Sequence, residues 1–139
     1  MADDSPERIW VYDTLRLAPP IAARFGERIK QGESFSKPLP IKPFLIYRMG
    51  NSSPDNRLHI ARRQYFTIYI HDEAMPGAYD VNIDPAVSEV IDAFDSAPPA
   101  PEYHILEARY LEHSSDQDDR EMGTILRYVR FQLIKSSWT

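Results

Sequence analysis

The chain has no cysteine among its 139 residues. Disulfide bonds and thiolate metal sites are therefore excluded, and an intracellular folding environment is expected. Glycine is scarce, with five residues, and no Gly-rich phosphate-binding loop is present. No apolar run approaches the ~20 residues that a membrane-spanning helix needs, so we expect no membrane partner. Residues 1–6 lack the basic and apolar regions of a signal peptide, which predicts a protein made in the cytosol.

The composition is otherwise that of a globular protein. Hydrophobic residues make up 42% and charged residues 27% of the chain, enough for a core of its own. We therefore predict that residues 1–139 form a single domain. The net charge of -5 argues against broad electrostatic binding to nucleic acid, which needs an excess of lysine and arginine. Twelve prolines predict loops with restricted conformations.

Hydrophobic periodicity predicts a small sheet with a helix laid on it, and a further helix near the N-terminus. Ser5 is a candidate cap for the first helix, and Pro20 to Phe25 form a further helical turn that ends at Gly26. Asp84 is the expected cap of the second helix, which has the clearest apolar stripe. The predicted helices span residues 6–17 and 85–95, and the predicted strands span residues 43–49, 62–71, 103–113 and 124–135.

Three segments between these elements are predicted to be loops. Residues 27–42 are rich in lysine, serine and proline, and residues 50–56 carry the strongest loop signal in the chain. The acidic run from Ser114 to Glu121 is predicted to be an exposed hairpin tip. Its carboxylates could bind a hard cation, but the glycine and the distal glutamate of a calcium loop are missing, so a solvated tip is favoured.

The strand predicted over residues 62–71 has two contrasting faces. Phe66, Ile68 and Ile70 alternate with Tyr65, Thr67 and Tyr69, so that one face is apolar and the other aromatic and hydroxylic. The second face suits contact with a helix or with another subunit, although tyrosines also line half-exposed sheet faces. The candidate residues for a subunit or partner interface are Tyr65, Thr67, Tyr69, Arg62 and Arg63.

Candidate chemical groups are few. The four histidines have no metal-ligand spacing, and His71 with Asp72 and Glu73 forms at most a fragment of a metal site. No serine has the flanking glycines of a nucleophile elbow. We therefore predict no catalytic, cofactor-binding or metal-binding residue. Basic residues stand beside aromatic ones in a pattern that could contact nucleic acid, namely Arg62, Arg63 and Tyr65, and Arg127, Tyr128 and Arg130.

The order of the elements resembles that of the tail terminator (tail completion) proteins of long-tailed bacteriophages. The resemblance spans residues 7–135 and rests on element order and on a few apolar, glycine and proline positions. It is carried by the N-terminal helix, Phe25-Gly-Glu-Arg-Ile29, Pro43-Phe-Leu-Ile-Tyr47, Gln64-Tyr-Phe-Thr-Ile-Tyr-Ile70, the helix from Val87 to Phe94 and a closing strand pair with a charged tip. The spacer from Pro98 to Pro101 and the long acidic turn depart from the pattern.

The resemblance implies an α+β fold, a small mostly antiparallel sheet with an N-terminal helix and a second helix packed on it. It also implies a structural virion protein without catalysis or cofactor. Such proteins form a ring, usually of six copies, at the head-proximal end of the tail tube, where they stop tube polymerisation. The implied partners are further copies of the chain, the tail tube protein and the head connector (stopper) protein, and DNA passes through the lumen without specific binding. The implied location is the virion tail, after assembly in the host cytoplasm.

Within that reading, a loop is expected to face the lumen or a neighbouring ring. The candidates are the acidic tip, with Asp116, Asp118, Asp119 and Glu121, and the loop from Asn51 to Asn56. Three alternatives stay open. The protein could be another head–tail connector part such as a stopper or adaptor, a small nucleic-acid-binding module, or a small hydrolase with a histidine beside an acid.

Overall fold

The computed structural model describes residues 6–32, 43–54, 61–75, 77, 79–119 and 123–136. Within these residues, three α-helices accompany a sheet of six strands. The helices are α1 (Pro6–Leu17), α2 (Pro19–Phe25) and α3 (Asp84–Asp95), and a π-helical turn (Tyr79–Ile83) leads into α3. The strands are β1 (Ile29–Gln31), β2 (Phe44–Pro54), β3 (Ala61–Glu73), β4 (Ile105–His113), β5 (Gln117–Asp119) and β6 (Thr124–Ser136).

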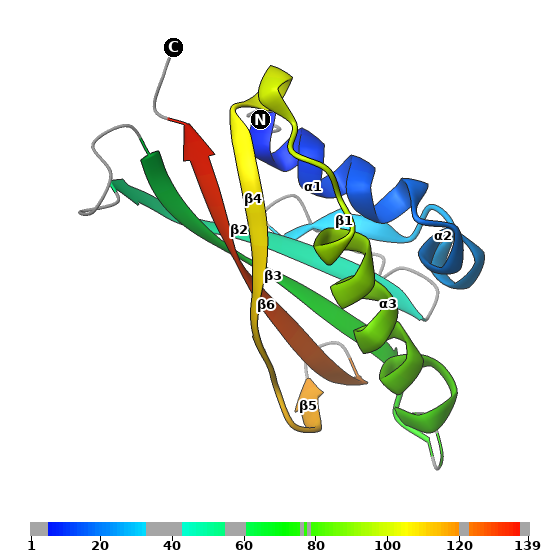
Figure 1. Cartoon of the computed structure of the whole chain (residues 1–139). Coiled ribbons are helices and arrows are strands. Elements are labelled where there is room, and N and C mark those ends of the chain that lie inside the picture. The colour runs from blue at the N-terminus through cyan, green and yellow to red at the C-terminus, as the bar shows by residue number, and fades with distance from the viewer. Residues whose placement is uncertain are drawn as a thin grey trace.

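The sheet has the strand order β1-β2-β3-β6-β4, with β5 paired to one end of β6 (Figure 1). β1 runs parallel to β2, and every other pairing is antiparallel. Helices α1 and α3 pack against one face of the sheet and enclose a single hydrophobic core. This arrangement confirms the predicted α+β class with a mostly antiparallel sheet.

An aromatic cluster holds the helices on the sheet. The rings of Phe66 and Phe131, on neighbouring strands, stack with centroids 5.0 Å apart. Phe94 of α3 packs on both of them at 5.0 and 4.8 Å, and Trp10 of α1 contacts Phe94 at 5.5 Å. Burying an aromatic side chain contributes a large apolar area, and tilted ring pairs add roughly 0.5–1.5 kcal/mol. The four rings therefore connect both helices to the two central strands.

A polar network fixes the C-terminal end of α2. The Arg24 guanidinium donates hydrogen bonds to both carboxylate oxygens of Glu89, at 2.7 and 3.0 Å. It also donates to Oδ1 of Asn82 at 3.1 Å, while Nδ2 of Asn82 donates to the buried Asp72 carboxylate at 2.8 Å. The network thus links α2, the π-helical turn, α3 and the end of β3 through charge-assisted hydrogen bonds.

The structure corrects three predictions about local structure before β3 and α3. Residues 27–42 are not a loop throughout, because Ile29–Gln31 form β1. The strand predicted over residues 43–49 continues to Pro54, past a bulge between Met49 and Ser52. Asp84 does not cap α3, since it lies inside the helix and its carboxylate pairs with Arg127. The proposed cap Ser5 lies outside the described residues.

Two further corrections concern the C-terminal half. The strand predicted over residues 103–113 begins later, because Pro101–Tyr103 form a 3-10 turn that ends at His104 with a φ of 62°. The acidic segment is not only a hairpin tip, since Gln117–Asp119 form β5 against β6. The structure places α1 at the residues predicted for the first helix, and β3, α3 and β6 within two residues of their predicted ends.

Candidate interaction surface

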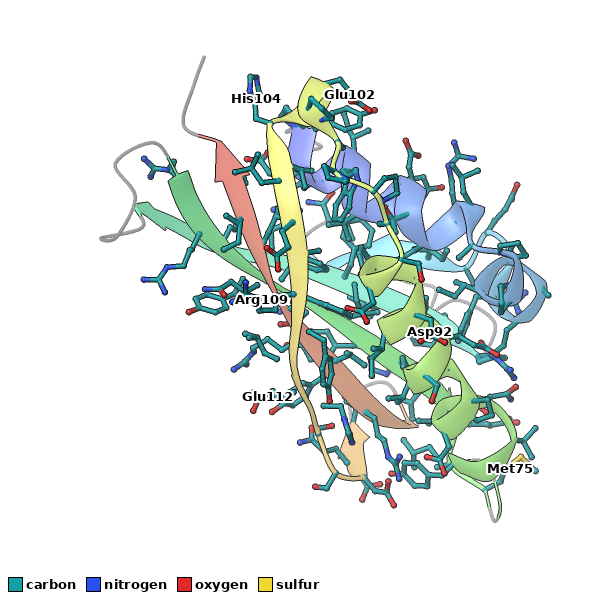
Figure 2. The ribbon with its side chains drawn as sticks, in the orientation of Figure 1. Met75, Asp92, Glu102, His104, Arg109 and Glu112 are labelled. Carbon is teal, nitrogen blue, oxygen red and sulfur yellow. The ribbon has the colours of Figure 1, made fainter. Side chains whose placement is uncertain are left out.

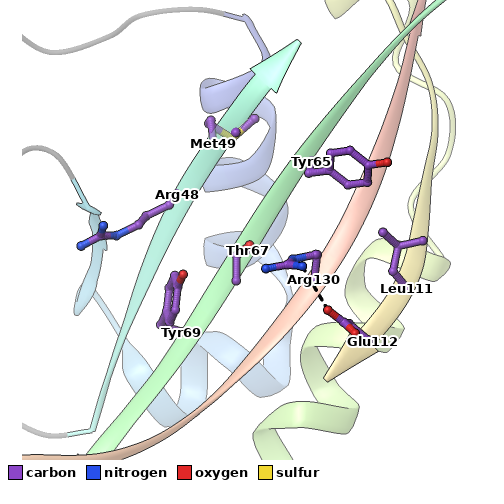
Figure 3. Close-up of a pocket in the computed structure, with 9 residues that line it drawn as sticks. Arg48, Met49, Tyr65, Thr67, Tyr69, Leu111, Glu112 and Arg130 are labelled. Atoms are coloured by element: carbon purple, nitrogen blue, oxygen red, sulfur yellow. Dashed lines mark hydrogen bonds and ion pairs between the residues drawn. The ribbon is translucent and has the colours of Figure 1, made fainter. Parts of the chain in front are cut away.

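The sheet has one face that α1 and α3 do not cover. Along β3, Phe66, Ile68 and Ile70 belong to the core, so the alternation of side chains directs Tyr65, Thr67 and Tyr69 to the other side. Figure 3 shows these three side chains in front of the strands, with the helices behind. We call this side, which carries Tyr65, Thr67 and Tyr69, the open face.

A groove of about 630 Å³ crosses the open face from one side of the sheet to the other. Its lining comes from four neighbouring strands of the sheet, β2, β3, β6 and β4 (Figure 3). The lining includes aromatic, charged and apolar side chains. It consists of Arg48, Met49, Gly50, Tyr65, Thr67, Tyr69, Leu111, Glu112 and Arg130.

The arginines of the groove lie on tyrosine rings. Arg48 lies 5.8 Å from the ring centre of Tyr69, and Arg130 lies 5.6 Å from that of Tyr128. The two tyrosines contact each other with centroids 6.0 Å apart. Arg130 also forms an ion pair with Glu112 at 3.1 Å, the contact dashed in Figure 3. No described carboxylate pairs with Arg48, and its side chain lies against Gly32, which follows β1.

The structure separates the two arginines that the sequence grouped together. Arg63 follows the alternation of Tyr65 and lies on the open face, where its Nε atom is buried without a hydrogen-bond partner. Arg62 lies opposite Lys135 in the register, on the helix side. There, Nζ of Lys135 donates to Glu7 of α1 at 2.6 Å and to Gln64 at 2.9 Å.

The acidic segment is tied to the rest of the molecule. Asp116 forms an ion pair with Arg127, which also pairs with Asp84 and lies 5.4 Å from the ring centre of Tyr79. The hydroxyl of Tyr79 donates to the carbonyl oxygen of Gln117 at 3.0 Å. Asp118 is exposed, Asp119 lies beside a second pocket, and Glu121 lies outside the described residues.

That second pocket, of about 250 Å³, is lined in part by His71. His71 is 3% exposed, stacks on Phe44 with centroids 4.8 Å apart, and has Nδ1 2.8 Å from Oγ1 of Thr124. Burial lowers the pKa of His71 to about 4, although Asp119 opposes this shift. His71 is therefore neutral at pH 7. It is held by structural contacts, which does not favour the hydrolase alternative.

Sequence reasoning missed several groove residues, above all Arg48, Leu111 and Glu112. The alternation of side chains along β2 could have placed Arg48 on the face opposite to that of Leu45 and Tyr47. It could not have placed Arg48 beside Tyr69, which lies on another strand. Glu112 reaches the groove because of a bulge between Tyr110 and Glu112. Figure 2 shows Arg109 and Glu112 on β4, on the side of the strand away from α3.

Comparisons with known proteins do not narrow the function of this surface. No protein-family model matches the sequence, and no curated protein matches it. The helices that the structure describes are too short or too polar to cross a bilayer. Among the described residues, no three acidic or histidine side chains are grouped so as to hold a metal ion. Geometry and charge therefore carry the functional argument.

Proposed function

We propose that the protein is a tail terminator of a long-tailed phage. In this role it forms a ring, six copies in the family that it resembles, on the head-proximal end of the tail tube. The ring stops tube polymerisation and joins the tail to the head connector. Its partners are further copies of itself, the tail tube protein and the stopper protein, and its location is the virion.

The observation that carries the proposal is the groove across the open face. Tyrosine and arginine are the residues that protein interfaces concentrate at their energetic centres. Here they meet on one sheet face together with the exposed side chain of Leu111. The helices cover the other face of the sheet. A face of this composition supports a role in contact with other protein chains.

A ring also needs two different contact surfaces on each copy, because a head-to-tail interface joins unlike patches. The two-layer fold offers unlike surfaces on its two sides. The open face carries Arg48 and Arg63, whereas α3 contributes four acidic residues and no basic one to the other layer. The net charge of -5 suits a channel along which DNA slides without being held.

The proposal is tested by assembly and capping. The purified protein is expected to give a closed oligomer of one size in native mass spectrometry. Electron microscopy of tail tubes mixed with it should show one added ring, at a single end of each tube. Rings found only on head portals would instead support a stopper or adaptor. A protein that binds neither tubes nor portals would contradict every head–tail role.

The open face also favours a second function, the binding of single-stranded nucleic acid. Exposed tyrosines can stack bases, and arginines can contact the backbone. The structure brings Tyr65, Tyr69 and Tyr128 together with Arg48, Arg63 and Arg130, whereas Arg62 and Arg127 lie on the helix side. Fluorescence anisotropy with a labelled oligonucleotide separates the two functions. Micromolar binding that weakens with salt supports this function, and no binding removes it.

A further inference from the structure

The segment that follows β4 has little apolar contact with the rest of the molecule. It comprises residues 115–119, the last three of which form β5, and we call it the strap. Its side chains are exposed except that of Asp119, which is half-buried. No strap residue belongs to the hydrophobic core that the structure describes. Burial of apolar area therefore contributes little to keeping the strap in place.

The chain on both sides of the strap is fixed to the sheet. Ser114 is buried, and its backbone N–H donates to the carbonyl oxygen of Tyr128 at 2.9 Å, while its Oγ accepts from the N–H of Tyr128 at 3.0 Å. On the other side, β6 begins at Thr124, which is buried with its Oγ1 2.8 Å from Nδ1 of His71. Movement of the strap therefore does not require movement of β4 or β6.

Polar contacts hold the strap, and Arg127 of β6 makes several of them. Arg127 pairs with Asp116 of the strap and with Asp84 at the start of α3. Its guanidinium lies 5.4 Å from the ring centre of Tyr79, whose hydroxyl donates to the carbonyl oxygen of Gln117 at 3.0 Å. The Arg127 side chain is only 23% exposed, so water screens these contacts less than those of a fully exposed ion pair. Arg127 thus ties the strap to α3 and to the π-helical turn.

β5 adds only a short ladder to these contacts. Its three residues pair with Thr124, Ile125 and Leu126 of β6, at the end of the sheet (Figure 1). The structure describes no strand on the outer side of β5. Segments with few buried apolar contacts and solvent-exposed backbone hydrogen bonds open at the lowest free-energy cost. The strap therefore belongs to the least stable part of the described fold.

We propose that the strap opens and closes as a unit while the rest of the fold stays intact, and that Arg127 keeps it closed. Opening removes one wall of the second pocket, because Gln117 and Asp119 line that pocket together with His71. Opening also frees the edge of β6 over residues 124–126, which another strand can then pair with. The inference goes beyond the proposed function and does not depend on a ring.

Hydrogen exchange followed by mass spectrometry tests the proposal, because it measures opening segment by segment. Arg127→Leu removes both ion pairs and the contact with Tyr79. Loss of two partly exposed ion pairs is expected to speed exchange in residues 115–119 roughly two- to thirtyfold. Exchange in α1 and β3 should stay as in wild type. Thermal melts followed by circular dichroism check that the variant folds.

Milder variants and a matched control define the role of Arg127. Arg127→Lys keeps the positive charge but loses the planar fork of donors, and Tyr79→Phe loses only the hydrogen bond to Gln117. Both are expected to speed exchange in the strap less than Arg127→Leu does. The matched control is Arg109→Leu, which removes an arginine that pairs with Glu107 on β4. It should leave exchange in the strap unchanged.

Three results would overturn the proposal. Unchanged exchange in the strap of Arg127→Leu would mean that Arg127 does not keep it closed. An equal rise in every segment would mean that the strap opens only when the whole protein unfolds. A rise of the same size in Arg109→Leu would mean that the contacts of Arg127 have no special role.

A disulfide lock gives a second readout that leaves Arg127 unchanged. Gln117 and Leu126 face each other in the register of β5 and β6. Facing residues of antiparallel strands have Cα atoms about 4.5–5.5 Å apart, which a disulfide can bridge. The chain has no cysteine of its own, so Gln117→Cys with Leu126→Cys allows one bond within the chain. Oxidation should slow exchange in residues 115–119, and reduction should restore it. Equal exchange in both states would contradict opening of the strap.

Discussion

Acidification should destabilise this protein through His71. The ring is buried, stacked on Phe44 and hydrogen-bonded to Thr124, and burial lowers its pKa from 6.5 to about 4. The unfolded chain takes up this proton near pH 6.5, whereas the folded chain takes it up only near pH 4. The stabilisation is therefore complete above pH 6.5 and is lost as the pH falls towards 4. At 1.36 kcal/mol for each pH unit, the loss approaches roughly 3 kcal/mol.

Urea unfolding at pH 7 and pH 4.5, followed by circular dichroism, measures this loss. Other groups also titrate in this range, so the comparison is with His71→Gln, whose side chain does not. Wild type is expected to lose about 2–3 kcal/mol more than the variant between the two pH values. If both proteins lose the same free energy of unfolding, protonation of His71 is not the cause. An NMR titration that places the pKa of His71 near 6.5 would refute the reasoning at its first step.

Three substitutions test the packing. Phe66→Ala removes a fully buried ring between Phe94 and Phe131 and should cost about 3–5 kcal/mol in the free energy of unfolding. Gly26→Ala places a side chain at a φ of 57° after α2 and should cost about 1–3 kcal/mol. Glu89→Gln removes the charge that faces Arg24 and should cost about 1–3 kcal/mol. Urea unfolding at pH 7 measures all three.

One control serves these substitutions. Asp92→Asn changes an exposed aspartate of α3, labelled in Figure 2, and should stay within about 0.5 kcal/mol of wild type. If Glu89→Gln behaves like this control, the Arg24 network does not hold α2 in place. A stable Gly26→Ala variant would mean that the backbone after α2 adopts another conformation, and a small effect of Phe66→Ala would contradict the aromatic core.

Strong periodic patterns made much of the fold predictable. The alternation around Phe66 identified β3 and its two faces, and the apolar stripe of α3 identified the helix. β1 and β5 were not predictable, because each has three residues and is defined by pairing with a distant strand. The role of Asp84 was predicted wrongly, since a tertiary ion pair with Arg127 takes the place of the cap.

The candidate surface was predictable only in part. Tyr65, Thr67 and Tyr69 share a face because they alternate along one strand, and the same rule could have separated Arg62 from Arg63. The placement of Arg48 and Glu112 in one groove depends on the register of three strand pairs and on a bulge in β4. No local pattern in the sequence specifies the register or the bulge.

Tail length tests the central proposal most directly. Negative-stain electron microscopy would compare lysates of a phage that carries this gene with lysates of the same phage lacking it. The proposal predicts over-long, headless tails when the gene is missing, and normal tail length when the gene is restored in trans. Tails of normal length beside heads that leak DNA would contradict a terminator and support a stopper or adaptor. Unchanged virions would contradict the phage assignment altogether.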